Sequence, residues 1–279
     1  MSAQHALMTL LMEKLATNML VLPTLPEIAV RVRQAADDPD INLHAMSEVI
    51  ALDPALAARM IKIANSAFIG RSVKVSTLNQ AVTRIGLSQV KNIATAMALE
   101  QLFVSHTAEV AATMADLWRD TVHVTCVAMA CLKLYLPQHK HDSLNLDTLT
   151  LAALVHRIGV LPILVEAEKY PEVFAEPEFL RKATDELASR IGVAIMRHWG
   201  FADAFIEVVS QWRQPLCSEA VQYTDFVRLG LLSLGYYRDR RDSDKLIEHY
   251  LKQGLIQNRN FMQDAQVATA VADAKAIFM

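Results

Sequence analysis

The sequence has little glycine and lacks the short turn signals that β-hairpins use. Only eight glycines occur in 279 residues, and neither Asn-Gly nor Asp-Gly is present. These dipeptides favour the tight turns that join antiparallel strands. Apolar residues instead recur at spacings of three and four along most of the chain, which is the period of one face of an α-helix. The sequence therefore predicts an all-α protein.

Cysteine is also sparse, which excludes two kinds of scaffold. Of the three cysteines, Cys126 and Cys131 are five positions apart and Cys217 is remote. No CxxC spacing is therefore available for a zinc site. An odd and sparse set of thiols suits a reducing cytoplasm better than a disulfide scaffold. Because residues 1–5 also lack the basic and apolar regions of a signal peptide, we expect a cytoplasmic protein.

Net positive charge and long apolar runs are missing as well. The formal net charge is −3, so the chain carries no electrostatic signal for nucleic acid or an anionic membrane. The most apolar run, residues 151–165, is too short to span a bilayer and contains His156 and Arg157. Apolar residues make up 53% of the chain, which is enough for a large core. We expect neither a nucleic-acid partner nor a membrane.

Common catalytic motifs are absent, but an ordered series of short motifs is present. The chain has no glycine-rich phosphate loop, GxSxG elbow or HExxH helix. The motifs that do occur lie at residues 22–26 (Leu-Pro-Thr-Leu-Pro), 50–56 (Ile-Ala-Leu-Asp-Pro-Ala-Leu), 63–67 (Ile-Ala-Asn-Ser-Ala), 78–82 (Leu-Asn-Gln-Ala-Val) and 84–87 (Arg-Ile-Gly-Leu). In this order they closely resemble the HDOD domain, a bacterial relative of the HD phosphohydrolases. The resemblance runs from about Leu15 to about Pro215.

The resemblance implies a two-part helical bundle whose C-terminal part is HD-like. We expect an N-terminal helical part at residues 1–104 and the HD-like bundle at residues 105–215. Residues 216–279 are expected to form a helical extension that packs on the bundle. Asn42, Asp53 and Asn145 have the positions and side chains of helix N-caps. Ser88 is predicted to be a further N-cap.

The resemblance also identifies a pocket in which the metal ligands have been replaced. HD phosphohydrolases bind metal through a helical histidine, a His-Asp pair and a distant aspartate. At the matching positions this sequence has Asp120, the pair His156-Arg157, and the neighbourhood of Leu231, where no carboxylate occurs. A guanidinium has no acceptor and cannot bind a metal. We therefore predict no catalytic residues, no metal and no cofactor, and a vestigial pocket made by Asp120, His156 and Arg157.

The replacements predict an ion pair in place of the metal. Ligands of one ion lie close together, so Asp120 and Arg157 are expected to meet, in a bidentate and at least half-buried pair. Removing one partner would then cost about 3–5 kcal/mol if the pair is buried. Arg157 and Arg119 could alternatively bind a small anion such as phosphate. His156 is interpreted as a buried histidine bonded to a neighbouring backbone or carboxylate group, rather than as a ligand.

A second candidate surface lies in the N-terminal part. Asn65, Ser66, Arg71 and Lys74 surround the loop that follows residues 63–67 and could form a recognition surface. The alternative, which we favour, is that these polar side chains hold the fold by bonding backbone groups at a helix end.

Two functions of different classes remain open. The resemblance implies a non-catalytic regulatory module of bacterial signal transduction, which would act by binding a protein partner or a small anionic ligand. The alternative is a metal-dependent phosphohydrolase of the HD superfamily that acts on a nucleotide or cyclic-nucleotide phosphoester. The loss of the expected ligands favours the first, because a catalytic metal needs about three protein ligands.

Overall fold

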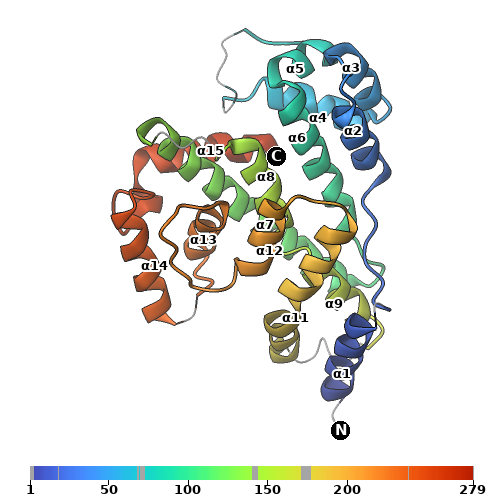
Figure 1. Ribbon diagram of the computed structural model, residues 1–279, viewed down its shortest axis with the longest axis vertical. Helices are drawn as coiled ribbons and strands as arrows, with labels where there is room; N and C mark the ends of the chain where they lie inside the picture. Colours follow the sequence, from blue (N-terminus) through green and yellow to red (C-terminus); the bar gives the residue numbers. More distant parts are fainter. Residues whose placement is uncertain are drawn as a thin grey trace.

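The computed structural model describes residues 3–278, except for residues 18, 68, 70–72, 140–143, 171–176 and 238. Within these ranges every regular element is a helix and no strand occurs, so the all-α prediction is confirmed (Figure 1). The caps predicted at Asn42, Asp53 and Asn145 are present, and each side chain accepts backbone N–H groups. Ser88 is not a cap, because Gly86 at φ 88° ends one helix and directly begins the next.

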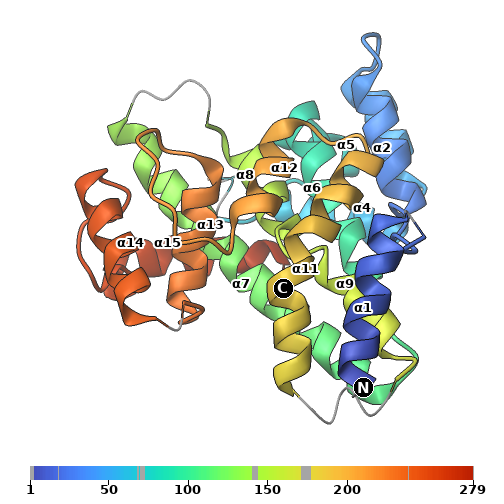
Figure 2. The same ribbon diagram turned by 60° about the horizontal axis from the view of Figure 1, so that its bottom comes forward.

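The N-terminal helices form two separate groups. Helices α2 to α6 pack against one another, whereas α1 lies apart from them and contacts α9 and α11 (Figure 2). Their bounds are α1 (Ala3–Ala16), α2 (Glu27–Asp37), α3 (Leu43–Ala51), α4 (Pro54–Ala64), α5 (Leu78–Ile85) and α6 (Leu87–Leu99). The chain between α1 and α2 therefore connects two faces of the protein.

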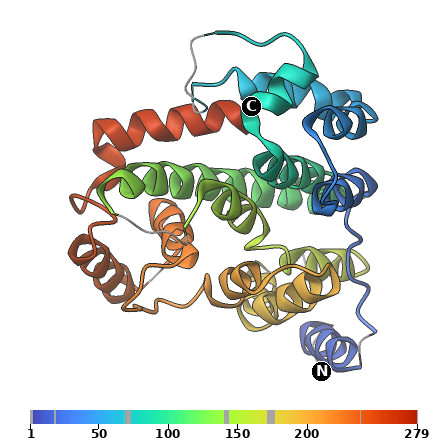
Figure 3. The same cartoon turned by 45° about the horizontal axis from the view of Figure 1, so that its top comes forward.

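A single long helix, α7 (Ala108–Tyr135), organises the rest of the chain. Helices α8, α13 and α15 all pack on it, and α15 runs alongside α7 (Figure 3). The approach of α13 is close, because a Cβ added at Gly230 would lie 2.6 Å from the carbonyl oxygen of Val124. Residues 216–279 thus supply two helices, α13 and α15, that lie against α7.

The remaining helices complete the HD-like part and the C-terminal region. They are α8 (Leu146–Val155), α9 (Val160–Ala167), α11 (Pro177–His198), α12 (Asp203–Gln211), α13 (Tyr223–Ser233), α14 (Arg240–Lys252) and α15 (Ala265–Phe278), with short 3₁₀ turns at Glu100–Leu102, Leu136–Gln138 and Phe261–Gln263.

The buried apolar residues form two clusters that do not follow the predicted segment boundaries. One cluster joins side chains of α4, such as Met60, to side chains of α7 and α15, such as Ile277. The other joins Leu11 of α1 to α8, α9 and α11. The division at residues 104 and 215 therefore remains a prediction.

One stretch, Leu146–Ala167, is long and apolar enough to cross a membrane by composition. Of its most apolar window, 83% is buried inside the protein. Such burial is typical of a core segment of a soluble protein, because a helix packed on all sides is apolar all round. The two helices of this stretch, α8 and α9, carry the candidate site between them.

Candidate functional site

The pair His156-Arg157 lies in the short turn between α8 and α9. This turn is pressed against α11, since a Cβ added at Gly159 would lie 1.9 Å from the carbonyl oxygen of Ala188. Gly192 of α11 is similarly close to α12, where a Cβ would meet Val209 at 2.4 Å. Glycine is therefore required for the close packing that fixes the position of the turn.

His156 belongs to the core. Its side chain is fully buried, its Nδ1 bonds to the carbonyl oxygen of Ala153, and its ring meets Trp212 edge-on at 5.2 Å. Burial, and then the adjacent charge of Arg157, lower the pKa of His156 to about 3. The imidazole is therefore neutral at physiological pH, with its proton on Nδ1. The backbone bond that the sequence predicts for this residue is confirmed.

Arg157 and Asp120 meet, but not in the predicted geometry. A single contact of 3.8 Å joins Nη1 of Arg157 to Oδ2 of Asp120, which is within ion-pair range but too long for a hydrogen bond. The prediction of a bidentate pair is therefore wrong. The side chain of Arg157 is 17% exposed and that of Asp120 is 46% exposed, so the carboxylate remains partly hydrated. Arg157 also leans towards the ring of Trp212, 5.9 Å from its centroid.

Arg119 does not reach this place. Its side chain is 72% exposed and forms an ion pair with Asp116 on the surface of α7. Consecutive helical residues point in directions about 100° apart. Asp120 consequently faces the pocket while Arg119 does not line it. The prediction that Arg119 and Arg157 share one anion site is wrong.

The pocket is a cleft of about 630 Å³ with charges of both signs. Its charged and phenolic lining comprises Asp116, Asp120, Asp185, Asp242, Arg157, Arg181, Arg213, Tyr236 and Tyr237. Arg213 is the residue that sequence reasoning missed. It donates to the hydroxyl of Tyr236 at 3.0 Å, to the carbonyl of Thr184 at 2.7 Å, and to Asp185. The signal was available, because residues 211–213 (Gln-Trp-Arg) stand where HDOD sequences often carry a His-His pair.

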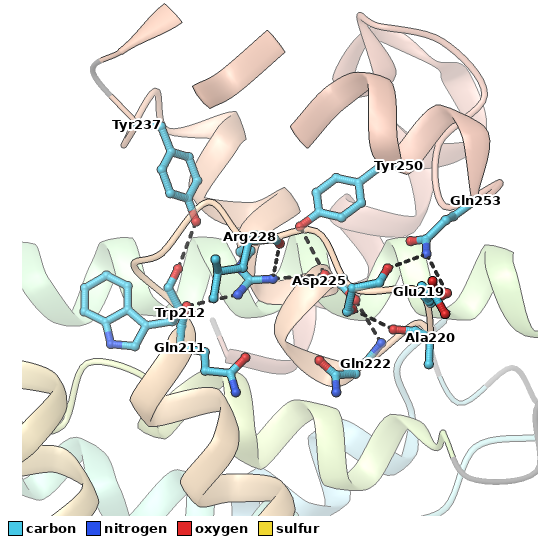
Figure 4. A network of polar contacts seen from close by, with 12 residues as sticks. Gln211, Trp212, Glu219, Ala220, Gln222, Asp225, Arg228, Tyr237, Tyr250 and Gln253 are labelled. Atoms are coloured by element: carbon cyan, nitrogen blue, oxygen red, sulfur yellow. Dashed lines mark hydrogen bonds and ion pairs between the residues drawn. The ribbon is translucent and has the colours of Figure 1, made fainter. Parts of the chain in front are cut away.

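A second charged group lies beneath the cleft and is fully buried. Arg228 and Asp225 of α13 are 1% and 0% exposed and form an ion pair of 3.1 Å. Arg228 also donates to the carbonyls of Leu216, at 2.9 Å, and Gln211, at 3.1 Å. The other oxygen of Asp225 accepts from the backbone of Gln222 at 2.9 Å (Figure 4).

This network holds in place the backbone that carries residues of the cleft. The hydroxyl of Tyr237, a residue of the cleft lining, donates to the carbonyl of Trp212 at 2.8 Å. Arg228 binds the preceding carbonyl, that of Gln211 (Figure 4). Both contacts fix the backbone that presents Trp212 and Arg213. The network was not predicted, since the sequence argument looked for a carboxylate near Leu231, which is a buried core residue.

One residue of the second candidate surface has a clear structural role. The side chain of Asn65 pairs with the backbone of Val75 in both directions, at 2.8 Å each, and so closes the loop between α4 and α5. The hydroxyl of Ser66 is buried. Lys74 is exposed, and Arg71 lies outside the described residues. For Asn65 the fold-holding interpretation is confirmed.

The helical arrangement is that of an HD-like fold, and residues 22–215 match the HDOD domain. The chain therefore belongs to the HDOD domain family.

Several other proteins resemble this one. A crystal structure from Shewanella amazonensis, of a protein provisionally named a metal-dependent phosphohydrolase, is 40% identical and superposes with a TM-score of 0.93 over 100% of both chains. A Marinobacter aquaeolei protein, provisionally named for signal transduction, is 19% identical, with a TM-score of 0.60 over 99% of this chain and 64% of its own. An uncharacterised protein of Treponema pallidum is 24% identical over 194 residues, 70% of this chain. This chain spans 35% of that relative's length.

The residues of the cleft do not fit the metal of the HD phosphohydrolases. Among the described residues, no three His, Cys, Asp or Glu side chains lie close enough to hold an ion. Nε2 of His156 and the carboxylate of Asp120 would provide at most two donors, and His156 is buried in the core and does not line the cleft, contrary to the predicted pocket. Arg157, 3.8 Å from Asp120, places a permanent positive charge beside them. This donor set is too small, and its charge opposes a cation.

Proposed function

We propose that this protein is a non-catalytic regulatory module of bacterial signal transduction, which acts in the cytoplasm by binding a protein partner or a small anionic ligand. Membership of the HDOD family supports a regulatory role. The observation that carries the non-catalytic part is Arg157, whose guanidinium occupies the position of a metal-binding carboxylate and contacts Asp120. Without a bound ion, neither a metal hydroxide nor a Lewis acid can assist phosphoester hydrolysis.

The cleft retains features that suit an anion. Arg157 and Arg213 of this cleft are each 17% exposed, whereas Asp185 is 34% and Asp120 is 46% exposed. The donors of Arg213 are engaged by protein acceptors. Nε of Arg157, in contrast, is buried without a partner in the described part of the chain. A phosphate or carboxylate could accept from this guanidinium, while the carboxylates nearer the mouth could accept from hydroxyl or amino groups of the same ligand.

The competing function is metal-dependent phosphoester hydrolysis. It is favoured by the name of the Shewanella amazonensis protein, which is 40% identical over its whole length. Fold and family alone do not determine activity, because activity depends on the residues of the site.

Metal content and turnover separate the two functions. We expect purified protein, loaded with manganese, iron or zinc and then desalted, to retain less than stoichiometric metal. We also expect it to hydrolyse p-nitrophenyl phosphate esters no faster than a metal-free blank. Arg157→Asp should not restore binding, because it would place two carboxylates together with too few further ligands. One tightly held ion per chain, with hydrolysis that His156→Gln abolishes, would establish the enzyme instead.

Anion binding has its own matched pair of variants. Phosphate should raise the melting temperature of the wild-type protein, and Arg157→Met should remove this effect. Arg119→Met changes an arginine outside the cleft and should retain it. Equal responses of the two variants would exclude the cleft as the anion site and leave partner binding as the proposed mode of action.

A further inference from the structure

A second pocket lies where the N-terminal helices meet α7, α8 and α15. Its volume is about 230 Å³, and its walls come from α4, α5, α6, α7, α8 and the last turn of α15. In Figure 1 the C-terminal end of α15 lies beside α8 and α6, close to α5. The pocket shares no residue with the cleft around Arg157.

Most of this pocket is apolar, with a few polar side chains. Ile93, Met129 and Phe278 are representative of the apolar walls. The charged side chains of the lining are Arg84 of α5 and Asp147 of α8, and Gln89 of α6 adds an amide. A mainly apolar pocket with a few convergent polar groups is the usual form of a small-molecule site.

Arg84 and Asp147 both line this pocket. Among the described residues, no ion pair within 4.0 Å joins Arg84 to Asp147. Arg84 donates one hydrogen bond, from Nη1 to the carbonyl of Ala64 at 3.2 Å. Partial burial raises the pKa of Asp147 to about 6, and among the described residues no cation or hydrogen-bond donor offsets its loss of water.

A position in the first turn of α8 accounts for an aspartate there, but not for its place in the lining of a mainly apolar pocket. Acidic residues are favoured near a helix N-terminus, where they normally remain in contact with water. The helix end is already capped by Asn145, whose side chain accepts from Thr148. Among the described residues, Asp147 therefore has neither a capping role nor a hydrogen-bonded partner.

We propose that this pocket binds an apolar α-amino acid, with the ligand's ammonium at Asp147, its carboxylate at Arg84 and Gln89, and its side chain against Ile93, Met129 and Phe278. Each charge of a zwitterion would meet the opposite charge of the protein. A volume of about 230 Å³ is below the range of about 300–1,000 Å³ that is usual for drug-sized ligands, so the ligand must be small.

The ligand would bridge two groups of helices. Arg84 and Gln89 belong to the N-terminal group, and Asp147 belongs to the HD-like part. Binding would therefore strengthen the contact between them, which is a means of regulating a binding module. This inference does not depend on the cleft, so its failure would leave the proposed function unchanged.

Calorimetric titration of the full chain tests the proposal. We expect L-leucine or L-phenylalanine to bind. Leucinamide, which lacks the carboxylate, 4-methylpentanoate, which lacks the amine, and glycine, which lacks the side chain, should each bind at least tenfold more weakly. Asp147→Asn and Arg84→Gln should each weaken leucine binding by a similar factor. Asp203→Asn, in the exposed first turn of α12, and Arg31→Gln, at an exposed position of α2, should not.

The pH dependence gives an independent readout. Arg84 is the only other charged side chain in the described lining, so Asp147 alone should titrate near pH 6. Affinity for leucine should fall as the pH drops below about 6, approaching tenfold per pH unit, because protonation removes the partner of the ammonium. Asp147→Asn should bind weakly at every pH. The proposal is overturned if no apolar amino acid binds at millimolar concentration, if 4-methylpentanoate binds as well as leucine, or if both pocket variants, folded by their melting curves, bind like wild type.

Discussion

Two of the aspartate–arginine pairs in the protein differ in almost every physical respect. Asp225 and Arg228 are withdrawn from water, and each makes further hydrogen bonds to backbone groups. Asp120 and Arg157 share one contact of 3.8 Å, and nearly half of the Asp120 side chain is exposed. The first pair joins α13 to the backbone around Trp212, whereas the second lies at the wall of a cleft.

This difference indicates that the Asp225–Arg228 pair serves the fold, whereas Arg157 of the other pair retains hydrogen-bond donors that a ligand could use. Burial raises the pKa of Asp225 even though the Gln222 amide and Arg228 favour its ionised form. The attraction therefore does not fully offset the cost of desolvating the carboxylate, and the value of the pair lies in the hydrogen bonds it completes. Among the described residues Arg157 completes no such set of bonds, so its guanidinium can be redirected to a ligand at little cost.

The largest effect should follow from breaking the buried pair. Asp225→Ala leaves the Arg228 charge buried without its partner, and we expect a loss of about 3–5 kcal/mol in the free energy of unfolding. Urea denaturation followed by circular dichroism measures this directly. Asp239→Ala provides a control on the surface, at the N-cap of α14, where a loss of about 1 kcal/mol is expected. Equal losses in the two variants would contradict the distinction between the pairs.

Acid should lower the free energy of unfolding of the protein through His156, which is buried in the core. The unfolded histidine titrates near 6.5, while in the folded protein the pKa is about 3, so the unfolded state binds more protons between these values. Stability contributed by the neutral ring is complete above pH 6.5 and is lost as the pH falls, by about 2 kcal/mol at pH 5.

A comparison of histidine variants checks this dependence. His156→Gln should be less stable than wild type at pH 7 and should show a flatter stability profile between pH 6.5 and 5. His44→Gln changes a histidine whose side chain is 72% exposed and should leave the wild-type profile unchanged. An unchanged profile in His156→Gln would show that other groups cause the acid sensitivity.

The smallest effect is expected at the pair that the sequence predicted. Asp120→Asn should change the free energy of unfolding by about 1 kcal/mol or less, since the contact is long and the carboxylate is hydrated. This replaces the value of about 3–5 kcal/mol expected for a buried pair. Denaturation at low and high salt measures it. A loss above about 3 kcal/mol would place Asp120 in the same class as Asp225.

The sequence predicts local features of the fold well, because their causes are local. Helical periodicity and the caps at Asn42, Asp53 and Asn145 depend on a few neighbouring residues. Ser88 failed as a cap because the preceding Gly86 connects two helices without an intervening loop. The position of α1, which contacts α9 and α11, depends on contacts more than 100 residues apart, such as Lys14 to Glu166.

At the candidate site, the identities of the residues were predictable but their geometry was not. The motif order places Asp120 and Arg157 together, and they do meet. It does not specify the rotation of α7, which directs Arg119 away from the cleft, or the contact of Arg157 with Trp212. Arg213 and the Asp225–Arg228 pair depend on how α12, α13 and α14 pack, which no single motif encodes.

The path of the chain between α1 and α2 has a mechanical consequence. Lys14 holds α1 to Glu166 on α9, and the indole of Trp199 donates to the carbonyl of Pro23 at 2.9 Å. The helices α2 to α6 are thus fastened at their start by this segment and at their end by the connection into α7. Both attachments are to the HD-like part of the protein. Helices α2 to α6 are therefore held at both ends of their segment and cannot rotate as a unit about a single connection. Separation of helices α2 to α6 from α8 must therefore break the hydrogen bond between Trp199 and Pro23 or extend the chain next to Pro23.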